Sequence, residues 1–117
     1  MSADIAAIVV TFQSASTIER CLDRLRAARD VQQIRVVDNA SDEGTLSSGE
    51  RPAALGPRVR FIGNPDNPGF AVACNQGARD ADAPWIAFVN PDCLVEADTL
   101  ARLHAHADAL GAPCLLG

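Results

Sequence analysis

Four polar segments of this sequence each follow directly after an apolar run. They are Thr11-Phe12-Gln13-Ser14, Asp38-Asn39-Ala40-Ser41, residues 64–69 (NPDNPG) and Asn90-Pro91-Asp92. Their carboxylates, amides and hydroxyls are groups that hydrogen-bond polar ligands or coordinate hard cations through oxygen. Ligands of open parallel sheets bind beyond the carboxyl ends of the strands. If one edge of a sheet collects the four segments, they predict a nucleotide-type site.

Each segment by itself also has a local interpretation, because Asp, Asn, Ser, Pro and Gly dominate ordinary turns. Asp38 fits as a turn former, and Ser41, Asp42 or Asp92 as a helix cap. The remaining candidates fit a helix that follows: Asn67 and Gly69 shape its start, and Asn75 is a helix side chain bonded to a nearby loop. Only the joint placement of these residues favours a binding site.

Apolar runs and helical spacing predict alternating strands and helices. Apolar, β-branched or alternating runs predict strands over residues 5–12, 34–38, 58–63 and 85–89. Apolar residues at helical spacing predict three helices: one from the Ser16-Thr17-Ile18-Glu19 capping box to about Arg29, one of small residues over 70–81, and one over 97–110 closed by Gly111. Residues 42–57 fit either a short helix or a loop, and residues 114–116 are typical of the start of another strand.

This order of elements predicts an α/β fold with a doubly wound, mainly parallel sheet and helices on both faces. Parallel neighbours require crossover connections, and these are right-handed. A length of 117 residues with 48% hydrophobic residues fits a single domain over residues 1–117.

The overall charge and the ends of the chain exclude several classes of partner. A net charge of -5 and a pI near 4.8 argue against a surface built for nucleic acid or anionic lipid. No apolar run approaches the roughly 20 residues that cross a bilayer, and the first residues lack the positive start of a secretory signal. We therefore expect no transmembrane segment and a cytoplasmic location, at the inner membrane face in a full-length protein.

Missing motifs narrow the kind of nucleotide site. The chain has neither a G-x-G-x-x-G after its first strand nor a G-x-x-x-x-G-K-[ST] motif, and it has no lysine. A diphosphate at an acidic edge therefore requires a divalent cation between its oxygens and a carboxylate. Asp92 is the best placed carboxylate, and Mg²⁺ or Mn²⁺ is the expected cofactor.

The cysteines and histidines do not predict a second site. Cys21, Cys74, Cys93 and Cys114 form no C-x-x-C pair, and we expect buried free thiols. His104 and His106 lie two residues apart on a predicted helix, so their side chains point to different sides. We expect both histidines to be solvated.

Four stretches, VVTFQSASTIERCLDRL, VVDNAS, NPDNPGFAVACNQGA and FVNPDC, together resemble the amino-terminal half of family 2 glycosyltransferases. The similarity is to the rhamnosyltransferase-like branch of the nucleotide-diphospho-sugar transferase (GT-A) fold. The stretches occur in the family's order over nearly the whole chain, and as a set they are specific. The resemblance implies a truncated GT-A-like fold that binds a nucleotide-sugar donor.

The resemblance also assigns roles to individual residues. It implies that Thr11 and its neighbours, including Phe12, line the base and ribose pocket, and that Asp38 with Asn39 binds the nucleotide. Around the donor it implies pocket walls formed by Asn67, Gly69 and Asn75. Asn90-Pro91-Asp92 stands where the family has its Asp-x-Asp metal motif, so Asp92 is the implied metal ligand and Asn90 a donor-binding residue. Asn90 replaces the first aspartate of that motif, and Gln13 stands where asparagine is common.

The resemblance implies transfer of a sugar from a dTDP or UDP carrier to the hydroxyl of a saccharide or lipid-linked acceptor, with inversion, in polysaccharide biosynthesis. It places the general base beyond residue 117, so no catalytic residue is assigned and we expect the isolated chain to be inactive. A non-catalytic nucleotide-binding module is the alternative. A nucleotidyltransferase of the same sheet topology is a third hypothesis, but those proteins usually carry a basic glycine-rich loop after the first strand, and TFQS at residues 11–14 is not such a loop. A truncated sheet further predicts self-association through an uncovered edge.

Overall fold

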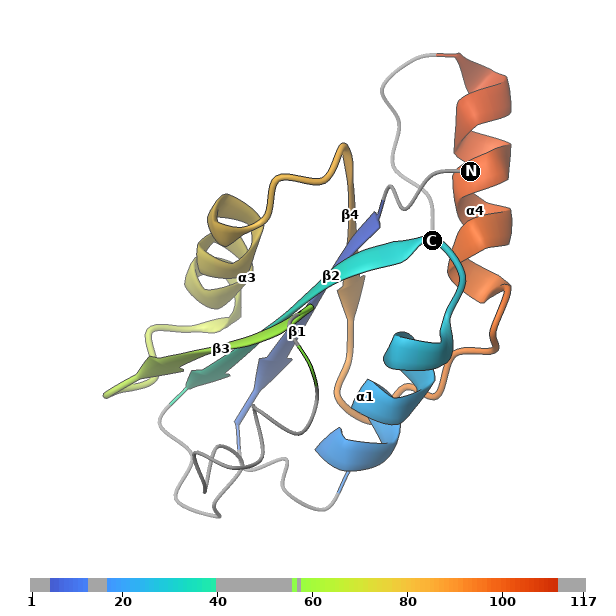
Figure 1. Ribbon diagram of the computed structural model, residues 1–117. Helices are drawn as coiled ribbons and strands as arrows, with labels where there is room; N and C mark the ends of the chain where they lie inside the picture. Colours follow the sequence, from blue (N-terminus) through green and yellow to red (C-terminus); the bar gives the residue numbers. More distant parts are fainter. Residues whose placement is uncertain (1–4, 13–16, 40–55, 57, 112–117) are drawn as a thin grey trace.

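The computed structural model describes residues 5–12, 17–39, 56 and 58–111 of the chain, and they form an α/β structure (Figure 1). The strands and helices follow one another as β1 (Ile5–Thr11), α1 (Ile18–Ala27), β2 (Val31–Asn39), β3 (Val59–Asn64), α3 (Phe70–Asp80), β4 (Trp85–Val89) and α4 (Thr99–Leu110).

The four strands form one parallel sheet in the order β3-β2-β1-β4. From β1 the chain winds through β2 to β3 in one direction, and then crosses back to place β4 on the other side of β1. Figure 1 shows α3 on one face of the sheet and α1 with α4 on the other. The predicted doubly wound α/β class is confirmed.

Alternation along β1 divides the core between the two faces. Ile5, Ala7 and Val9 belong to the cluster that packs against the buried side of α1, whereas Ile8 faces α3. A Cβ atom at Gly77 of α3 would lie 2.5 Å from Cγ2 of Ile8, a distance that real Cβ atoms do not reach. The close approach predicted for a helix of small residues is therefore observed.

Several element boundaries differ from the sequence-based expectations. β2 begins at Val31, three residues early, because Val31 is buried and pairs with Ile5 even though polar glutamines follow it. α1 begins at Ile18 with Thr17 as its N-cap, one residue later than the capping box predicts. α4 begins at Thr99 rather than at residue 97, because the carbonyl of Ala97 accepts from the Arg29 amide (2.8 Å). It ends as predicted at Gly111, which has φ 71.

The expectations for Gln13, Ser16, Ser41 and residues 42–55, 57 and 114–116 lie outside the described residues. Among the described helices, none has both the length and the apolar character that a membrane span requires.

The prediction of two solvated histidines is wrong for His104 and correct for His106. The His104 side chain is only 10% exposed, and its ring centroid lies 5.5 Å from that of Trp85 in β4. Its Nδ1 lies 3.9 Å from a carboxylate oxygen of Asp30. The sequence spacing placed His104 on a helix, but the contact of that helix with β4 requires the tertiary fold.

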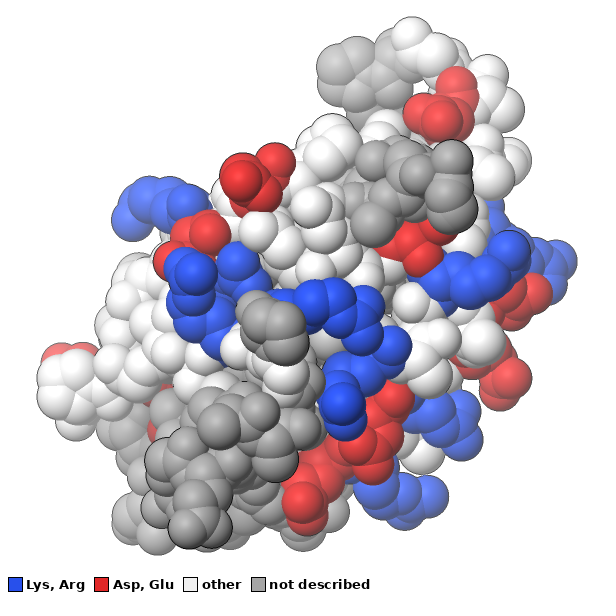
Figure 2. All heavy atoms as spheres, in the orientation of Figure 1, with Lys and Arg blue, Asp and Glu red and all other residues white. Residues whose placement is uncertain are grey.

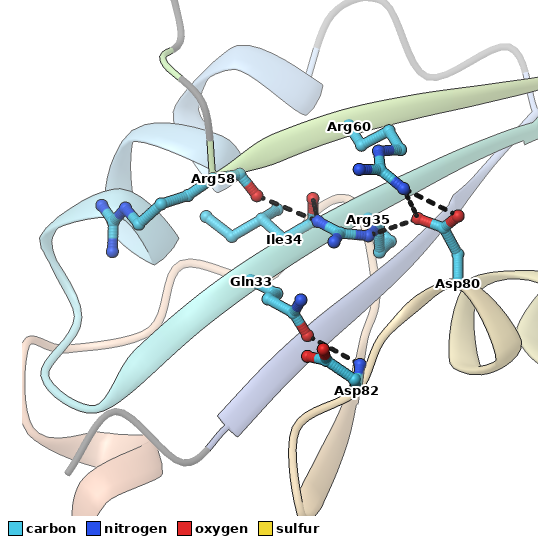
Figure 3. Close-up of polar contacts among 7 residues, drawn as sticks. All are labelled: Gln33, Ile34, Arg35, Arg58, Arg60, Asp80 and Asp82. Carbon is cyan, nitrogen blue, oxygen red and sulfur yellow. Dashed lines mark hydrogen bonds and ion pairs between the residues drawn. The ribbon is translucent and has the colours of Figure 1, made fainter.

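An ion pair between the buried Arg35 and the partly exposed Asp80 joins the C-terminal end of α3 to the sheet (Figure 3). Nε of Arg35 in β2, whose side chain is 5% exposed, lies 2.6 Å from Oδ2 of Asp80. Nη1 of Arg35 also donates to the carbonyls of Ile34 and Arg58. Arg60 of β3 is largely exposed and donates from Nη1 to both Asp80 oxygens at 2.9 Å. One carboxylate therefore binds two strands to α3.

The two outer strands of the sheet differ in charge. Figure 2 shows basic side chains gathered over the start of β3, the strand nearest the viewer in Figure 1. Arg58 and Arg60 are exposed there, and Arg58 joins the start of β2 to the last turn of α1 by donating to the carbonyls of Val31 and Arg26. β4, at the opposite side, contains no charged residue and exposes 53% of Phe88.

Replacing Asp80 by Asn should destabilise the fold far more than replacing Arg60 by Gln. The Asp80→Asn change leaves the buried Arg35 without its counter-charge, a loss worth about 3 kcal/mol, whereas the exposed Arg60 pair is worth about 1 kcal/mol or less. Urea unfolding of both variants measures the difference. Equal, small losses of unfolding free energy in the two variants would show that Asp80 is not the shared anchor.

Candidate functional site

The parallel register brings the described residues of the four polar segments to one edge of the sheet. Thr11 at the end of β1 is the direct Cα partner of Asp38 in β2, and Asn39 is the partner of Asn64 in β3. On the other side of β1, Val9 pairs with Val89, so the chain leaves β4 at the same edge and continues into Asn90-Pro91-Asp92. This edge includes the point between β1 and β4 where the winding direction reverses, which is where doubly wound sheets bind ligands.

Thr11 and Asp38 form a buried hydrogen-bonded pair at the centre of this edge. Oγ1 of Thr11 donates to Oδ1 of Asp38 at 2.7 Å, and the two residues are 0% and 5% exposed. Alternation along the strands places both side chains on the α1 face. Thr11 therefore orients the Asp38 carboxylate, while Phe12, the next residue, is 51% exposed.

A tight turn follows β4 and carries Asp92. The amide of Cys93 donates to the carbonyl of Asn90 at 3.0 Å, and Sγ of Cys21 in α1 lies 3.6 Å from the same oxygen. Further along, Nη1 of Arg24 in α1 donates to the carbonyl of Val95 at 3.2 Å. α1 therefore holds the segment after β4 at several points and fixes the exposed Asp92 relative to the sheet.

The thiols near this turn differ in environment. Burial, and to a smaller extent Cys93 and the nearby Asp92 carboxylate, together raise the pKa of Cys21 to about 11. Cys74 in α3 is buried too, and its burial raises its pKa. Cys93 is exposed, so the prediction of buried thiols is correct for Cys21 and Cys74 and wrong for Cys93, whose position in the turn faces outward. Cys114 lies outside the described residues.

On the α3 face, a network of side-chain amides connects the ends of β2 and β3. Asn39, which is 2% exposed, accepts from Nδ2 of Asn64 at 2.8 Å and donates to the carbonyl of Gly69 at 3.2 Å. Asn64 also pairs with Gln76 of α3. The Asn39 side chain thus makes its observed hydrogen bonds within the protein. Its contact with a nucleotide-sugar donor stays a prediction.

Asn67 and Gly69 shape the start of α3. Oδ1 of Asn67 accepts from the Gly69 amide at 3.1 Å, and Gly69 adopts φ 104, a backbone angle that favours glycine. The local interpretation of these two residues is therefore confirmed, and their contact with a donor stays a prediction. Asn75 is exposed on α3.

The sequence did not single out Asn64 or Gln76 as functional candidates. Asn64 does lie in one of the polar segments after a strand, whereas Gln76 carries no signal of its own within a helix of small residues. Their pairing follows only from the tertiary arrangement of β3 and α3.

Asp92 alone does not make a complete metal site. In the part of the chain that the structure describes, no group of three or more His, Cys, Asp or Glu side chains is arranged to hold a metal ion. One exposed carboxylate at the sheet edge fits a cation that takes its other oxygens from a diphosphate and water, as Mg²⁺ commonly does. The residues present are therefore compatible with the expected cofactor if the cation is bound jointly by Asp92, a diphosphate and water.

A doubly wound parallel sheet with Thr11, Asp38 and Asp92 at its carboxyl edge has the arrangement in which open α/β domains bind their ligands. The chain matches the family model described as Glycosyl transferase family 2 over residues 6–117. It belongs to glycosyltransferase family 2, and the resemblance found in the four sequence stretches is confirmed.

Several solved structures have the same fold as this chain. TarS 1-349 of S. aureus superposes with a TM-score of 0.76 at 23% identity, covering 93% of this chain and 33% of that one. TarS 1-349 was also solved with UDP-GlcNAc. The mannosyltransferase PcManGT of Pyrobaculum calidifontis, in complex with GDP-Man and Mn²⁺, gives 0.75 at 30% identity over 84% of this chain and 30% of that one. The chain thus spans about a third of these neighbours. A search of curated proteins gave no match.

Thiol labelling should separate Cys93 from Cys21 and Cys74. A thiol reacts as its thiolate, and a pKa near 11 leaves only about one Cys21 thiol in a thousand ionised at pH 8. We expect iodoacetamide to label Cys93 in the folded chain at pH 8 and to leave Cys21 and Cys74 unlabelled, read by peptide mass spectrometry. Labelling in urea provides the control, because all three thiols should then react. Rapid labelling of Cys21 in the folded state would contradict the observed packing of α1 on the turn after β4.

Proposed function

We propose that this chain binds a nucleotide-diphospho-sugar donor together with a divalent cation, as the donor half of a sugar transferase. The observation that carries the proposal is the placement of the Thr11–Asp38 pair and the Asp92 turn at one edge of the sheet, on both sides of the winding reversal. The donor is a dTDP- or UDP-sugar, and the acceptor is a hydroxyl of a saccharide or lipid-linked molecule.

Each residue contributes a distinct function in this proposal. Asp38 accepts a hydrogen bond from the nucleotide base, and Thr11 holds its carboxylate in place. Asp92 contributes one oxygen ligand to the cation. A bound cation would neutralise the charge that develops on the leaving diphosphate during the displacement. A carboxylate general base beyond residue 117 completes the inverting reaction.

Nucleotide binding without transfer is the behaviour proposed for the 117-residue chain itself. Its extent is about a third of the solved neighbours, and the proposal assigns to it the donor side of the site only. Sugar transfer to an acceptor by the isolated chain would contradict this restriction to binding. The proposal that the chain binds the nucleotide-sugar donor would still stand after that result.

Replacement of Asp92 by Asn should remove the metal dependence of nucleotide binding. We expect Mn²⁺ to strengthen binding of UDP or dTDP to the wild type about tenfold or more, a difference of about 1.4 kcal/mol, and to have little effect on the variant. Calorimetric titration with and without Mn²⁺ measures both, and GDP tests the choice of base.

Asp82→Asn is the matched control for this experiment. Asp82 is an exposed carboxylate just before β4, at the opposite edge of the sheet from Asp92. Its replacement by Asn therefore changes the net charge by the same amount as Asp92→Asn but lies away from the proposed site. The Asp82→Asn variant should retain the wild-type response to Mn²⁺. If Asp92→Asn retains that response as well, the cation does not bind at Asp92.

We also propose that the chain self-associates through β4. Exposed arginines cover the β3 side of the sheet, whereas β4 has no charge or proline and exposes Phe88, the features that favour strand pairing. Sedimentation should show a dimer at high concentration, and Phe88→Lys should shift it to monomer. A wild type that stays monomeric at every concentration would exclude this assembly.

A further inference from the structure

We propose that Asn64 and Gln76 are positioning residues of the donor site, which they support by holding the Gly69 segment and the end of β2 together. This inference rests on the proposed function, since it concerns the same site. The proposal assigns neither residue a direct contact with the nucleotide or the cation. Their effect is transmitted through Asn39, the residue next to Asp38.

Asn64 and Gln76 form a reciprocal amide pair. Nδ2 of Asn64 donates to Oε1 of Gln76 at 2.7 Å, and Nε2 of Gln76 donates back to Oδ1 of Asn64 at 2.8 Å. Such a pair requires a hydrogen-bond donor and a hydrogen-bond acceptor on both side chains. Among uncharged residues, the side-chain amides of Asn and Gln provide both groups in one fixed plane. The pair fixes the orientation of the Asn64 amide.

The orientation of Asn64 then determines that of Asn39. The same Nδ2 of Asn64 also donates to Oδ1 of Asn39 at 2.8 Å, which leaves the Asn39 NH₂ group directed to the carbonyl of Gly69 at 3.2 Å. That carbonyl also accepts the Ala73 amide in the first turn of α3. The end of β2, the end of β3 and the first turn of α3 are therefore joined by one continuous set of hydrogen bonds.

This network lies directly behind the Thr11–Asp38 pair. Asn39 and Asp38 are neighbours in β2 and point to opposite faces, so the network fixes on the α3 face the strand end that presents Asp38 on the α1 face. It also fixes residues 65–69, which carry Asn67, between two anchored ends. Small displacements of groups that contact a ligand weaken binding, because part of the binding free energy is then used to restore the geometry of the site.

A second attachment of α3 to the sheet serves as a control for a purely structural role of Asn64 and Gln76. Its C-terminal end is joined to the same two strands, β2 and β3, by the Arg35–Asp80–Arg60 ion pairs, away from the carboxyl edge (Figure 3). Loss of either attachment should destabilise the fold. Only loss of the amide pair should change nucleotide binding.

The experiment compares Gln76→Glu with Asp80→Asn. Glutamate keeps the shape of Gln76, but its carboxylate cannot donate and places an oxygen against Oδ1 of Asn64. Unfolding in urea gives the stability of each variant, and titration with UDP or dTDP in the presence of Mn²⁺ gives its affinity. We expect Gln76→Glu to bind the nucleotide about tenfold more weakly than wild type, a loss typical of one broken hydrogen-bonded contact. Asp80→Asn should retain wild-type affinity within about twofold, the scatter expected of a change outside the site.

A second variant and a second measurement cover the case in which Gln76→Glu does not fold. Gln76→Met removes the amide without adding charge, and it should weaken binding in the same direction. In the free protein, the Gly69 amide proton should exchange faster in either folded Gln76 variant than in Asp80→Asn, because the Gly69 carbonyl loses its hydrogen bond from Asn39 and the turn in which the Gly69 amide donates to Asn67 is then less restrained.

The outcomes separate the two proposals. A wild type that binds no nucleotide would overturn the proposed function, and this inference with it. A wild type that binds, with Gln76→Glu or Gln76→Met binding equally well, would overturn this inference alone. Equal losses of affinity in the Gln76 variants and in Asp80→Asn would also overturn it, because binding would then follow stability rather than local geometry.

Discussion

The parallel pairing of β1 with both of its neighbours is the constraint on which the rest of this structure depends. Because β2 and β4 run in the same direction as β1, the residues that follow all three strands emerge at one edge. The register is equally restrictive. A slip of one residue would turn the side chain of Asp38 to the α3 face and separate it from Thr11, since strand side chains alternate.

Two helices support this edge from opposite faces by different chemistry. α1 lies on one face and holds the turn after β4 through bonds to backbone carbonyls, among them the contact of Cys21 with Asn90. α3 lies on the other face and holds the ends of β2 and β3 through the side-chain amides of Asn64 and Gln76. The close approach of Gly77 to Ile8 allows α3 to lie near enough to the sheet for those short side chains to meet.

The sequence predicted the features that depend on local pattern, and it missed those that depend on contacts between distant elements. Apolar runs located all four strands, but the start of β2 was placed too late because glutamines follow the buried Val31. Residues at the ends of strands were recognised as candidates from their position alone. Three features depend on which helix covers which strands, and no short segment of sequence encodes that. They are the exposure of His104, the Arg35–Asp80 ion pair and the pairing of Asn64 with Gln76.

Asn90, which by the sequence resemblance stands in place of the first aspartate of the family's metal motif, is compatible with an intact turn. The bonds that define the turn use the backbone carbonyl of Asn90, which accepts from the Cys93 amide and contacts the Cys21 thiol, so the identity of the Asn90 side chain is not required for its shape. The replacement removes one negative charge and leaves a neutral amide oxygen. Because cation affinity rises with the number of charged ligands, a cation at this turn would depend on Asp92 and on the charge of the diphosphate itself. Metal and nucleotide should therefore bind cooperatively, each weakly without the other.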